Sequence, residues 1–499
     1  MKLGAIDRGR RELTGSDNRS FELRARPGLV RGLGAPAAAA IVLGTMVGTG
    51  IFLKPGEMAG EAGSVAVVFA AWILGGILSL FGALCYAELG ASLPEAGGEY
   101  SYLRRGLGTV WGFFFGWMHS IVARPASVAA IAAGLLRFSA FLYPRLAEPI
   151  SVFHLRSLLG TGRTFDLTFT WMQPLAVAAL VIITFINYLG VRVGGRFQVA
   201  LTVLKVLSLV VIIVAGFALL HGQKQARVMQ PLWPSHLGWN TVRGLFAAMA
   251  AAVWAYDGWN DLNLVGSEVQ NPERNFPRVI VGGTLFVIVL FLLFNFVCFR
   301  ALPFDVIAAS EHVASDVFAS FAGRAAALGI TVVMAISALG TLNASVLSGA
   351  RVDYAMARDG LFFKFVAAVH PQYRTPGAAL IFQCCLGSLM AMTGTFEDLT
   401  SLVMFGSWIF YGLAVIAMMR MRRTEPDLPR PFRTWGYPVV PVLFVAGAWA
   451  IAASLWLALP VRCSIGLAAI LSGLFFYRSW RTAGAPPDPP MDEAQCDPT

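Results

Sequence analysis

Nine residues in the first long apolar segment decide the fold, and they read Gly44-Thr45-Met46-Val47-Gly48-Thr49-Gly50-Ile51-Phe52. Three of these nine residues are glycine, which weakens a helix. Inside a bilayer every backbone N–H and C=O needs a hydrogen-bond partner, so a weakened helix is tolerated only where the opened backbone faces protein, water or a ligand. The stretch therefore predicts a broken membrane helix that borders a functional cavity.

A second apolar segment has the same character, because Trp254-Ala255-Tyr256-Asp257-Gly258-Trp259-Asn260 places a carboxylate and a glycine deep within it. Two interrupted helices about half a chain apart are typical of transporters whose site lies between inverted repeats. The pair predicts a protein that moves a small zwitterion across a membrane.

The composition is that of a helical membrane protein. Of the 499 residues, 57% are hydrophobic and 13% are charged, and the mean hydropathy is +0.67. The net charge of +10 comes from short basic runs between apolar segments. We interpret these basic residues as determinants of membrane topology and expect no nucleic-acid partner. The six cysteines lack metal-ligand spacing, and no motif indicates a cofactor or an enzyme active site.

The predicted fold is an all-α polytopic membrane protein with twelve transmembrane helices in a five-plus-five inverted repeat, with helices 1 and 6 interrupted. Each span is long enough to cross a hydrocarbon core of about 30 Å. Most Lys and Arg residues fall in loops that are cytoplasmic if both termini are cytoplasmic, which predicts an integral protein of the plasma (inner) membrane. Residues 31–481 form one transport domain, and residues 1–30 and 482–499 are expected to be disordered cytoplasmic tails. The twelve spans are centred near Gly48, Leu78, Ala123, Val181, Leu209, Trp254, Leu290, Ile336, Gly387, Ile409, Ala448 and Leu471.

The first break suits the two charges of an α-amino acid. A break at Gly48-Thr49-Gly50 leaves free N–H groups and the positive end of a helix dipole for a carboxylate, and the Thr49 hydroxyl adds a donor. Carbonyls near Met46 and Trp254, at the ends of the preceding half-helices, suit an ammonium group. The alternative is that Gly44 and Gly48 form only a helix-packing face.

The second break contributes Asp257, Gly258 and Asn260 to the candidate substrate site. An intramembrane carboxylate is functional by default. Asp257 could bind a cationic side chain, carry a proton or cap the exposed amides of the broken helix. Trp254 lies beside the break, where its ring could cover a bound substrate as a gate, or it could be a large packing residue.

Two further polar residues lie within spans. Lys205 is about 15 Å into the fifth span, beyond the reach of snorkelling, so its ammonium group needs partners such as the carbonyls of the broken first helix. There it would replace a sodium ion. His119, near the middle of the third span, could relay protons or be a hydrogen-bonded structural residue. Arg124 could line the outer vestibule or pair structurally, and we expect the structural role.

Several motifs occur in the order found in the L-type amino acid transporter family of the amino acid-polyamine-organocation superfamily, and residues 29–480 resemble that family. Besides the two breaks, they are Pro94-Glu95-Ala96-Gly97-Gly98-Glu99-Tyr100-Ser101-Tyr102-Leu103, Arg124-Pro125, Asn271-Pro272-Glu273 with Pro277, and Ser348-Gly349-Ala350-Arg351 through Asp359-Gly360.

The resemblance implies the fold first seen in a bacterial leucine transporter, and sodium-independent exchange of amino acids by alternating access. It assigns the substrate carboxylate to Gly48, Thr49 and Gly50, and the amino group to the carbonyls of Met46 and Trp254. It assigns side-chain selection to Asp257 and Asn260, and Lys205 matches the family lysine that replaces the sodium site.

Two features differ from the animal members of that family. Members that take large neutral amino acids have glycine where this chain has Asp257, whereas a member that takes cationic amino acids and cystine has aspartate, so cationic substrates stay possible beside neutral ones. The expected outer loop, residues 141–170, lacks the cysteine that bonds to a heavy-chain glycoprotein. We therefore expect no disulfide-linked heavy chain, as in the stand-alone bacterial members. A proton-coupled symporter and a non-transporting amino-acid sensor are the alternative functions.

Overall fold

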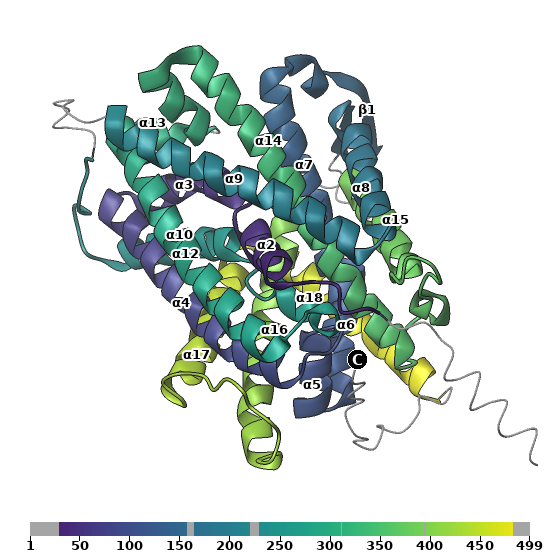
Figure 1. The fold of residues 1–499 in the computed structure, drawn as a ribbon. Helices are drawn as coiled ribbons and strands as arrows, with labels where there is room; N and C mark the ends of the chain where they lie inside the picture. The colour runs from purple at the N-terminus through teal and green to yellow at the C-terminus, as the bar shows by residue number, and fades with distance from the viewer. Residues whose placement is uncertain (1–28, 157–163, 220–228, 311, 394–395, 483–499) are drawn as a thin grey trace, which may run out of the picture.

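The computed structural model describes residues 29–156, 164–219, 229–310, 312–393 and 396–482 of the 499-residue chain. Within these ranges nine helices are long and apolar enough to span a membrane, and they pack into one bundle (Figure 1). Two further apolar helices are shorter, α8 (Met172–Tyr188) and α15 (Gly377–Thr393). The protein is thus a mostly helical membrane protein, and the count of twelve spans stays a prediction.

Both predicted helix breaks are confirmed. The first apolar segment forms α2 (Ala35–Met46) and α3 (Gly50–Ala62), with residues 47–49 outside either helix. The sixth segment forms α10 (Trp239–Tyr256), and a turn over residues 257–260 leads to the short α11 (Asp261–Leu264) and a 3-10 turn, η3 (Gly266–Glu268). The two breaks face each other, because the Thr45 hydroxyl donates to the Gly258 carbonyl at 2.9 Å.

The other helices form the bundle around these broken pairs (Figure 1). The third predicted span consists of α6 (Thr109–Met118), one π-helical turn, η1 (His119–Ala123), and α7 (Arg124–Leu142). The remaining elements are α4 (Val65–Ser92), α5 (Glu99–Leu107), α9 (Val191–Leu219), α12 (Pro272–Ala301), α13 (Phe304–Ala309), α14 (Val313–Arg358, with non-helical backbone at Gly323), η4 (Lys364–Ala367), α16 (Phe396–Thr424), α17 (Val439–Ala458) and α18 (Pro460–Thr482).

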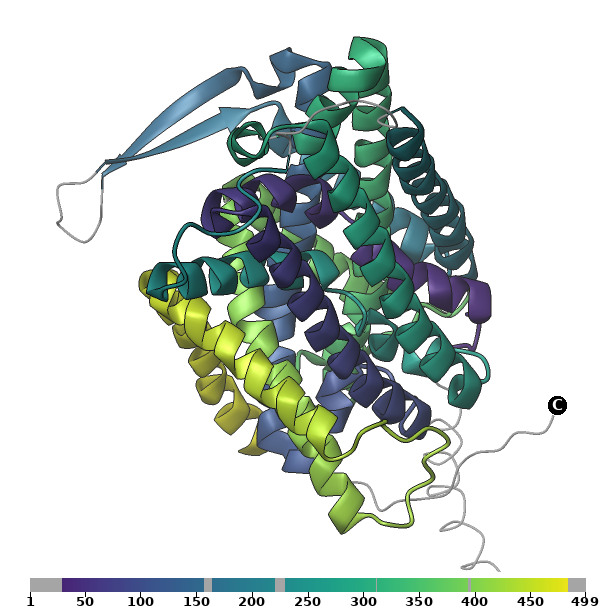
Figure 2. The same ribbon diagram turned by 90° about the vertical axis from the view of Figure 1, so that its left-hand side faces the viewer.

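The expectation of a purely helical fold is wrong in the segment after α7. After a short 3-10 turn, η2 (Pro144–Ala147), strands β1 (Pro149–Arg156) and β2 (Thr164–Thr170) form an antiparallel hairpin, which projects from the bundle (Figure 2). Polar and apolar residues alternate along the sequence from Thr164 to Thr170, which is the period of a strand. The tails expected at residues 1–30 and 482–499 lie almost entirely outside the described residues.

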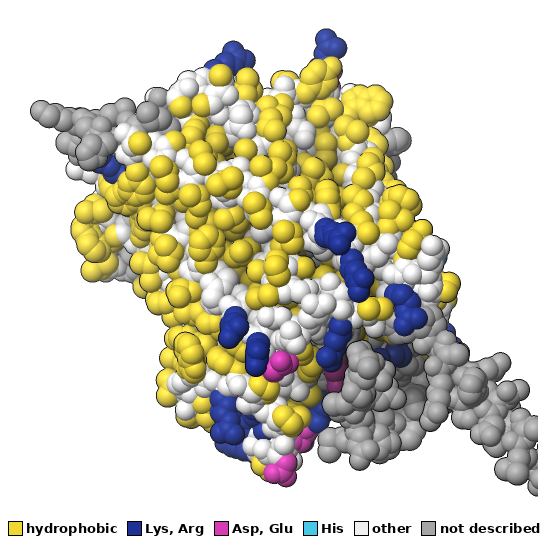
Figure 3. All heavy atoms as spheres, viewed as in Figure 1, with side chains coloured by type: hydrophobic (Ala, Val, Ile, Leu, Met, Phe, Trp, Pro, Cys, Tyr) yellow, Lys and Arg dark blue, Asp and Glu magenta, His cyan; other side chains and the backbone are white. Residues whose placement is uncertain are grey.

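Apolar and basic side chains are distributed over the surface as expected for a membrane protein. Hydrophobic side chains form a wide band on the face shown in Figure 3, and Lys and Arg gather mostly below it. The helix α9 crosses this face, and Val203, Leu207, Val211 and Val214 are each at least 57% exposed along it. Exposed aliphatic side chains at helical spacing are suited to contact lipid.

Tertiary contacts hold α11 in place, since a helix of four residues cannot be stable alone. At its far end the Arg351 guanidinium of α14 binds the Glu268 carboxylate, with Nη2 and Oε2 2.9 Å apart and both side chains at most 1% exposed. The Asn263 amide donates to the Tyr86 carbonyl and to the Tyr102 hydroxyl, each at 2.9 Å. The second break therefore depends on polar contacts with α14, α4 and α5.

Replacing Arg351 with glutamine should destabilise the protein by about 3–5 kcal/mol, because it leaves the Glu268 carboxylate buried without its cation. The measurement is the apparent Tm of the purified protein in detergent. The matched control is Arg105→Gln, which breaks an ion pair with Glu425 whose side chains are 28% and 23% exposed and should cost about 1 kcal/mol or less. Equal shifts for both variants would contradict the anchoring role of the Arg351–Glu268 pair.

Candidate functional site

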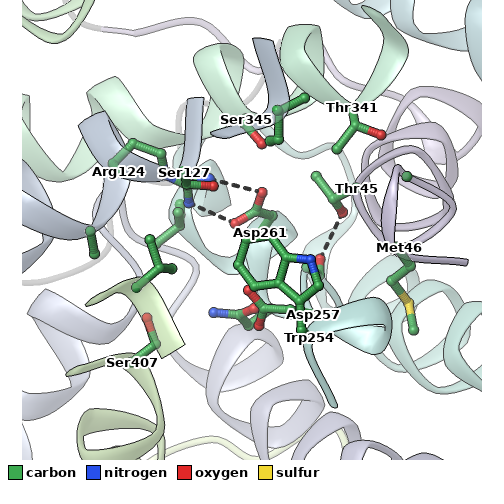
Figure 4. Close-up of a pocket in the computed structure, with 18 of the residues that line it drawn as sticks. Thr45, Met46, Arg124, Ser127, Trp254, Asp257, Asp261, Thr341, Ser345 and Ser407 are labelled. Atoms are coloured by element: carbon green, nitrogen blue, oxygen red, sulfur yellow. Dashed lines mark hydrogen bonds and ion pairs between the residues drawn. The ribbon is translucent and has the colours of Figure 1, made fainter. Parts of the chain in front are cut away.

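One cavity lies where the two helix breaks meet, and residues of α5, α6, η1, α7, α14 and α16 also line it (Figure 4). Its lining includes all eight residues predicted to bind substrate, together with His119. Those eight are Met46, Gly48, Thr49, Gly50, Trp254, Asp257, Gly258 and Asn260. The structure brings these residues together, and their roles in binding stay predictions.

The first break exposes backbone donors to the cavity. Val47 has φ −79° and ψ 74°, and the Gly48 amide donates to the Met46 carbonyl at 2.9 Å, which is an inverse γ-turn. The helix α3 then begins at Gly50. Within the described part of the chain, the amides of Thr49, Gly50 and Ile51 have no hydrogen-bond acceptor. Three free N–H groups thus lie at the positive end of the α3 dipole.

The carbonyl end of α2 is satisfied by side chains from two other helices. Lys205 of α9 is 1% exposed; its Nζ donates to the Gly44 carbonyl and lies 3.3 Å from the Thr341 hydroxyl of α14. Thr341 also donates to the Gly44 carbonyl at 3.0 Å, and Ser337, one turn earlier, donates to the Val47 carbonyl at 3.1 Å. Lys205 therefore does not line the cavity. Its ammonium group binds the Gly44 carbonyl, which has lost its partner within the helix because of the break.

The second break is a sharp change in backbone direction. Asp257 has extended backbone at ψ 149°, and Gly258 follows with φ +108°, a conformation that favours glycine. A Cβ at Gly258 would also lie 2.5 Å from the Thr45 Cβ. Only glycine fits here, because the two breaks approach each other this closely.

Asp257 and Trp254 both face the cavity (Figure 4). The Tyr411 hydroxyl of α16 donates to Asp257 Oδ1 at 3.1 Å. Trp254 is partly exposed, and its indole lies in the middle of the site in the view of Figure 4. The ring is thus placed beside the space that a ligand would fill.

An ion pair that the sequence did not predict crosses the site. Arg124 binds Asp261, the first residue of α11, with nitrogen–oxygen distances of 2.7 and 3.3 Å (Figure 4). The Ser348 hydroxyl donates to the same carboxylate at 3.1 Å. The expectation that Arg124 pairs structurally is confirmed, and its partner fixes the start of the second half-helix.

His119 belongs to this network rather than standing alone. Arg124 Nε donates to His119 Nε2 at 3.4 Å, so that nitrogen acts as an acceptor and the imidazole is neutral. The geometry favours the structural interpretation of this histidine over the proton relay.

The stripe of hydroxyl residues on α14 is a second group that the sequence did not predict. Ser337, Thr341, Ser345 and Ser348 recur at intervals of three or four residues, so they share one helix face. Thr341 and Ser345 line the cavity, and Ser337 and Ser348 bind the two breaks. Helical spacing of hydroxyl residues inside an apolar span was the signal that could have revealed them.

The structure gives Gly50 a packing role besides its predicted one. A Cβ on Gly50 would lie 2.7 Å from the Ala255 Cα and 3.0 Å from its Cβ. The start of α3 and the end of α10 therefore touch backbone to backbone. A side chain at Gly50 would push the two broken helices apart before it reached any ligand.

Comparison with known proteins finds relatives that cover most of the chain. The family described as amino acid permease matches residues 33–474. The chain is 31% identical to the serine/threonine exchanger SteT of Bacillus subtilis over 90% of its own length and 97% of that protein. It is 31% identical to mouse b(0,+)-type amino acid transporter 1 over 90% of this chain and 88% of that one. It is 32% identical to human large neutral amino acids transporter small subunit 2 over 90% and 80%, respectively.

Replacing Gly50 with alanine should separate α3 from α10 and cost about 1–3 kcal/mol of stability through overpacking. Ligand binding should weaken in parallel, since the free amides of α3 move with the helix. Thermal unfolding in detergent measures the first effect, and ligand-induced stabilisation measures the second. The control is Gly60→Ala on the same helix, where the nearest atom to an added Cβ is 3.9 Å away. If both variants behaved alike, the close approach at Gly50 would not matter to the site.

Proposed function

The chain belongs to the amino acid permease family, and from this premise we propose that it is a sodium-independent amino acid exchanger that works by alternating access. As a member of that family it is an amino acid transporter of the L-type group and not an enzyme. The observation that carries the proposal is the row of three free amides at the start of α3, since two of their residues, Thr49 and Gly50, line a cavity between two broken helices.

The free amides suit the carboxylate of an amino acid. The N–H groups of Thr49, Gly50 and Ile51 lack acceptors within the described residues, and an unpaired buried donor is costly unless a ligand satisfies it. A carboxylate has several acceptor positions and the charge that the helix dipole stabilises. The Thr49 hydroxyl, which also lines the cavity, adds one donor.

The carbonyls of Met46 and Trp254 suit the amino group. Each accepts one backbone hydrogen bond, Met46 from the Gly48 amide at 2.9 Å and Trp254 from the Asp257 amide at 3.2 Å. A carbonyl oxygen has two lone pairs, so each can accept another bond from a substrate ammonium group. The amide donors of α3 and the carbonyl acceptors of Met46 and Trp254 together select a zwitterion. The Trp254 ring would cover the bound substrate as a gate.

Lys205 supports transport without sodium. Its ammonium group binds the Gly44 carbonyl and lies beside the Thr341 hydroxyl. A carbonyl and a hydroxyl are also the ligand types that a sodium ion uses at a broken helix. A covalently attached cation in this position supplies the same contact and needs no ion gradient. Exchange, in turn, is supported by a relative, SteT, that is named as a serine/threonine exchanger.

Asp257 bears on the choice of substrate side chain. It lines the cavity, and the Tyr411 hydroxyl donates to one of its oxygens, so the other oxygen can bind a cationic substrate. We propose that neutral amino acids are favoured and that cationic ones are admitted. The relatives include a transporter named for large neutral amino acids and one named as b(0,+)-type.

A proton-coupled symporter is the second candidate, and Asp257 is the residue that favours it. His119 gives it less support, because Arg124 donates to its Nε2. A non-transporting sensor would share the same binding residues, so only a flux measurement separates it from a transporter. Under either mechanism we propose cytoplasmic termini, a location in the plasma membrane and no disulfide-linked heavy chain, since residues 141–170 contain no cysteine.

The exchange mechanism predicts uptake only when both sides hold substrate. Purified protein in liposomes should take up labelled amino acid when unlabelled amino acid is inside, with choline in place of sodium on both sides. Empty vesicles should show little uptake. Uptake into empty vesicles after a pH step would support the symporter instead, and binding with no flux in any condition would support the sensor.

Replacing Lys205 with alanine should reduce exchange at least about tenfold, because the Gly44 carbonyl loses a charge-assisted hydrogen bond inside the membrane. The same flux assay measures this, with folding checked by size-exclusion profile and thermal unfolding. Ser208→Ala, three residues later on the same helix, removes a hydroxyl that only bonds within α9 and should leave exchange intact. Unchanged exchange in Lys205→Ala would remove this lysine from the mechanism.

Replacing Asp257 with asparagine should weaken competition by lysine relative to that by leucine, since the carboxylate is the group that would attract a side-chain cation. Competition for labelled substrate by the two amino acids measures the ratio. An unchanged ratio would assign Asp257 a structural role at the break.

A further inference from the structure

Glu99 is a carboxylate in the cavity wall that the proposed mechanism leaves unused. It is the first residue of α5 and is 0% exposed. It lines the same cavity as the two helix breaks. A buried carboxylate is costly unless its oxygens are bonded, so its surroundings indicate what it serves.

One oxygen of Glu99 is bonded and the other is not. The Asn260 amide, from the second break, donates through Nδ2 to Glu99 Oε1. This contact fixes the orientation of the amide, because a carboxylate can only accept. Within the described residues, Glu99 Oε2 and Asn260 Oδ1 are left without a hydrogen-bond partner. Two unpaired acceptor oxygens therefore belong to residues of the cavity wall.

No described cation bonds to these acceptors, although the charge of Arg124 acts on Glu99 through space. Arg124, which lines the cavity too, is bound to Asp261 at 2.7 Å. Among the described residues, Glu99 forms no ion pair. Burial raises the pKa of the Glu99 carboxyl to about 8, so the free oxygen can hold a proton itself or accept a hydrogen bond from a ligand that enters the cavity.

We propose that Glu99, together with Asn260, selects substrates whose side chain carries a hydrogen-bond donor, either a hydroxyl or an ammonium group. This inference rests on the proposed function of the cavity and names the substrate class. A hydroxyl can donate to one of the two oxygens, Glu99 Oε2 or Asn260 Oδ1, and an ammonium group can donate to both, whereas an aliphatic side chain leaves both unpaired. An ionised acidic side chain brings no donor and leaves both oxygens unpaired.

Threonine and valine test this directly, because they have the same shape and differ by one hydroxyl. The wild-type protein in liposomes should exchange threonine in preference to valine. The variant Glu99→Gln keeps an oxygen for the Asn260 amide but presents a donor where the carboxylate presents an acceptor. It should lower the threonine-to-valine ratio about fivefold, because the threonine hydroxyl can still bond to the amide but loses the stronger bond to a charged acceptor.

Glu95→Gln is the matched control. It makes the same chemical change four residues earlier, at a partly buried position that does not line the cavity. The ratio should stay at the wild-type value. A second measurement, the shift in Tm that each amino acid induces in detergent, reports binding even if Glu99→Gln transports too slowly to measure.

The outcomes separate this inference from the proposed function. If the wild-type protein exchanged amino acids but treated threonine and valine alike, or if Glu99→Gln kept the wild-type ratio in flux and in binding, Glu99 would not select the side chain; its free oxygen would then bond only to ordered water. If the wild-type protein exchanged no amino acid at all, the proposed function itself would fail.

Discussion

The hydrogen bond from the Lys205 ammonium group to the Gly44 carbonyl satisfies the constraint on which the rest of the site depends. A helix that breaks inside a bilayer leaves carbonyls at one end and amides at the other, and neither can stay unpaired in hydrocarbon. Lys205 and the hydroxyls of α14 satisfy the carbonyl end of α2. The amide end of α3 stays open, and so it is available to a ligand.

The second break is also stabilised by charged side chains, but here they form ion pairs. Asp261 at the start of α11 is held by Arg124, and Glu268 at the end of η3 is held by Arg351. The helix α14 reaches both breaks, through Ser337 and Thr341 at the first and Ser348 and Arg351 at the second. In the alternating-access cycle that we propose, a rearrangement of the two broken helices therefore has to exchange contacts with α14.

Local composition made the two breaks predictable, since glycines and an aspartate inside an apolar run are costly for a membrane helix that continues without interruption. The depth of Lys205 likewise indicated that its partners must be protein groups. Three other features could not be predicted from the sequence and were seen only in the folded structure. Asp261 and Glu99 lie just outside the apolar runs, so nothing in their spacing showed that they reach the cavity. The hairpin of β1 and β2 lies in a segment where a loop was expected. The close approach of Gly50 to Ala255 joins residues 205 positions apart, a contact that no local pattern contains.

A structure with a bound amino acid, determined by electron cryomicroscopy in lipid nanodiscs without sodium, tests the central claim most directly. The account predicts the substrate carboxylate within hydrogen-bond distance of the Thr49, Gly50 and Ile51 amides, with Lys205 Nζ still on the Gly44 carbonyl. A substrate carboxylate bound to Arg124 instead, or a metal ion between Gly44 and Thr341 with Lys205 displaced, would contradict it.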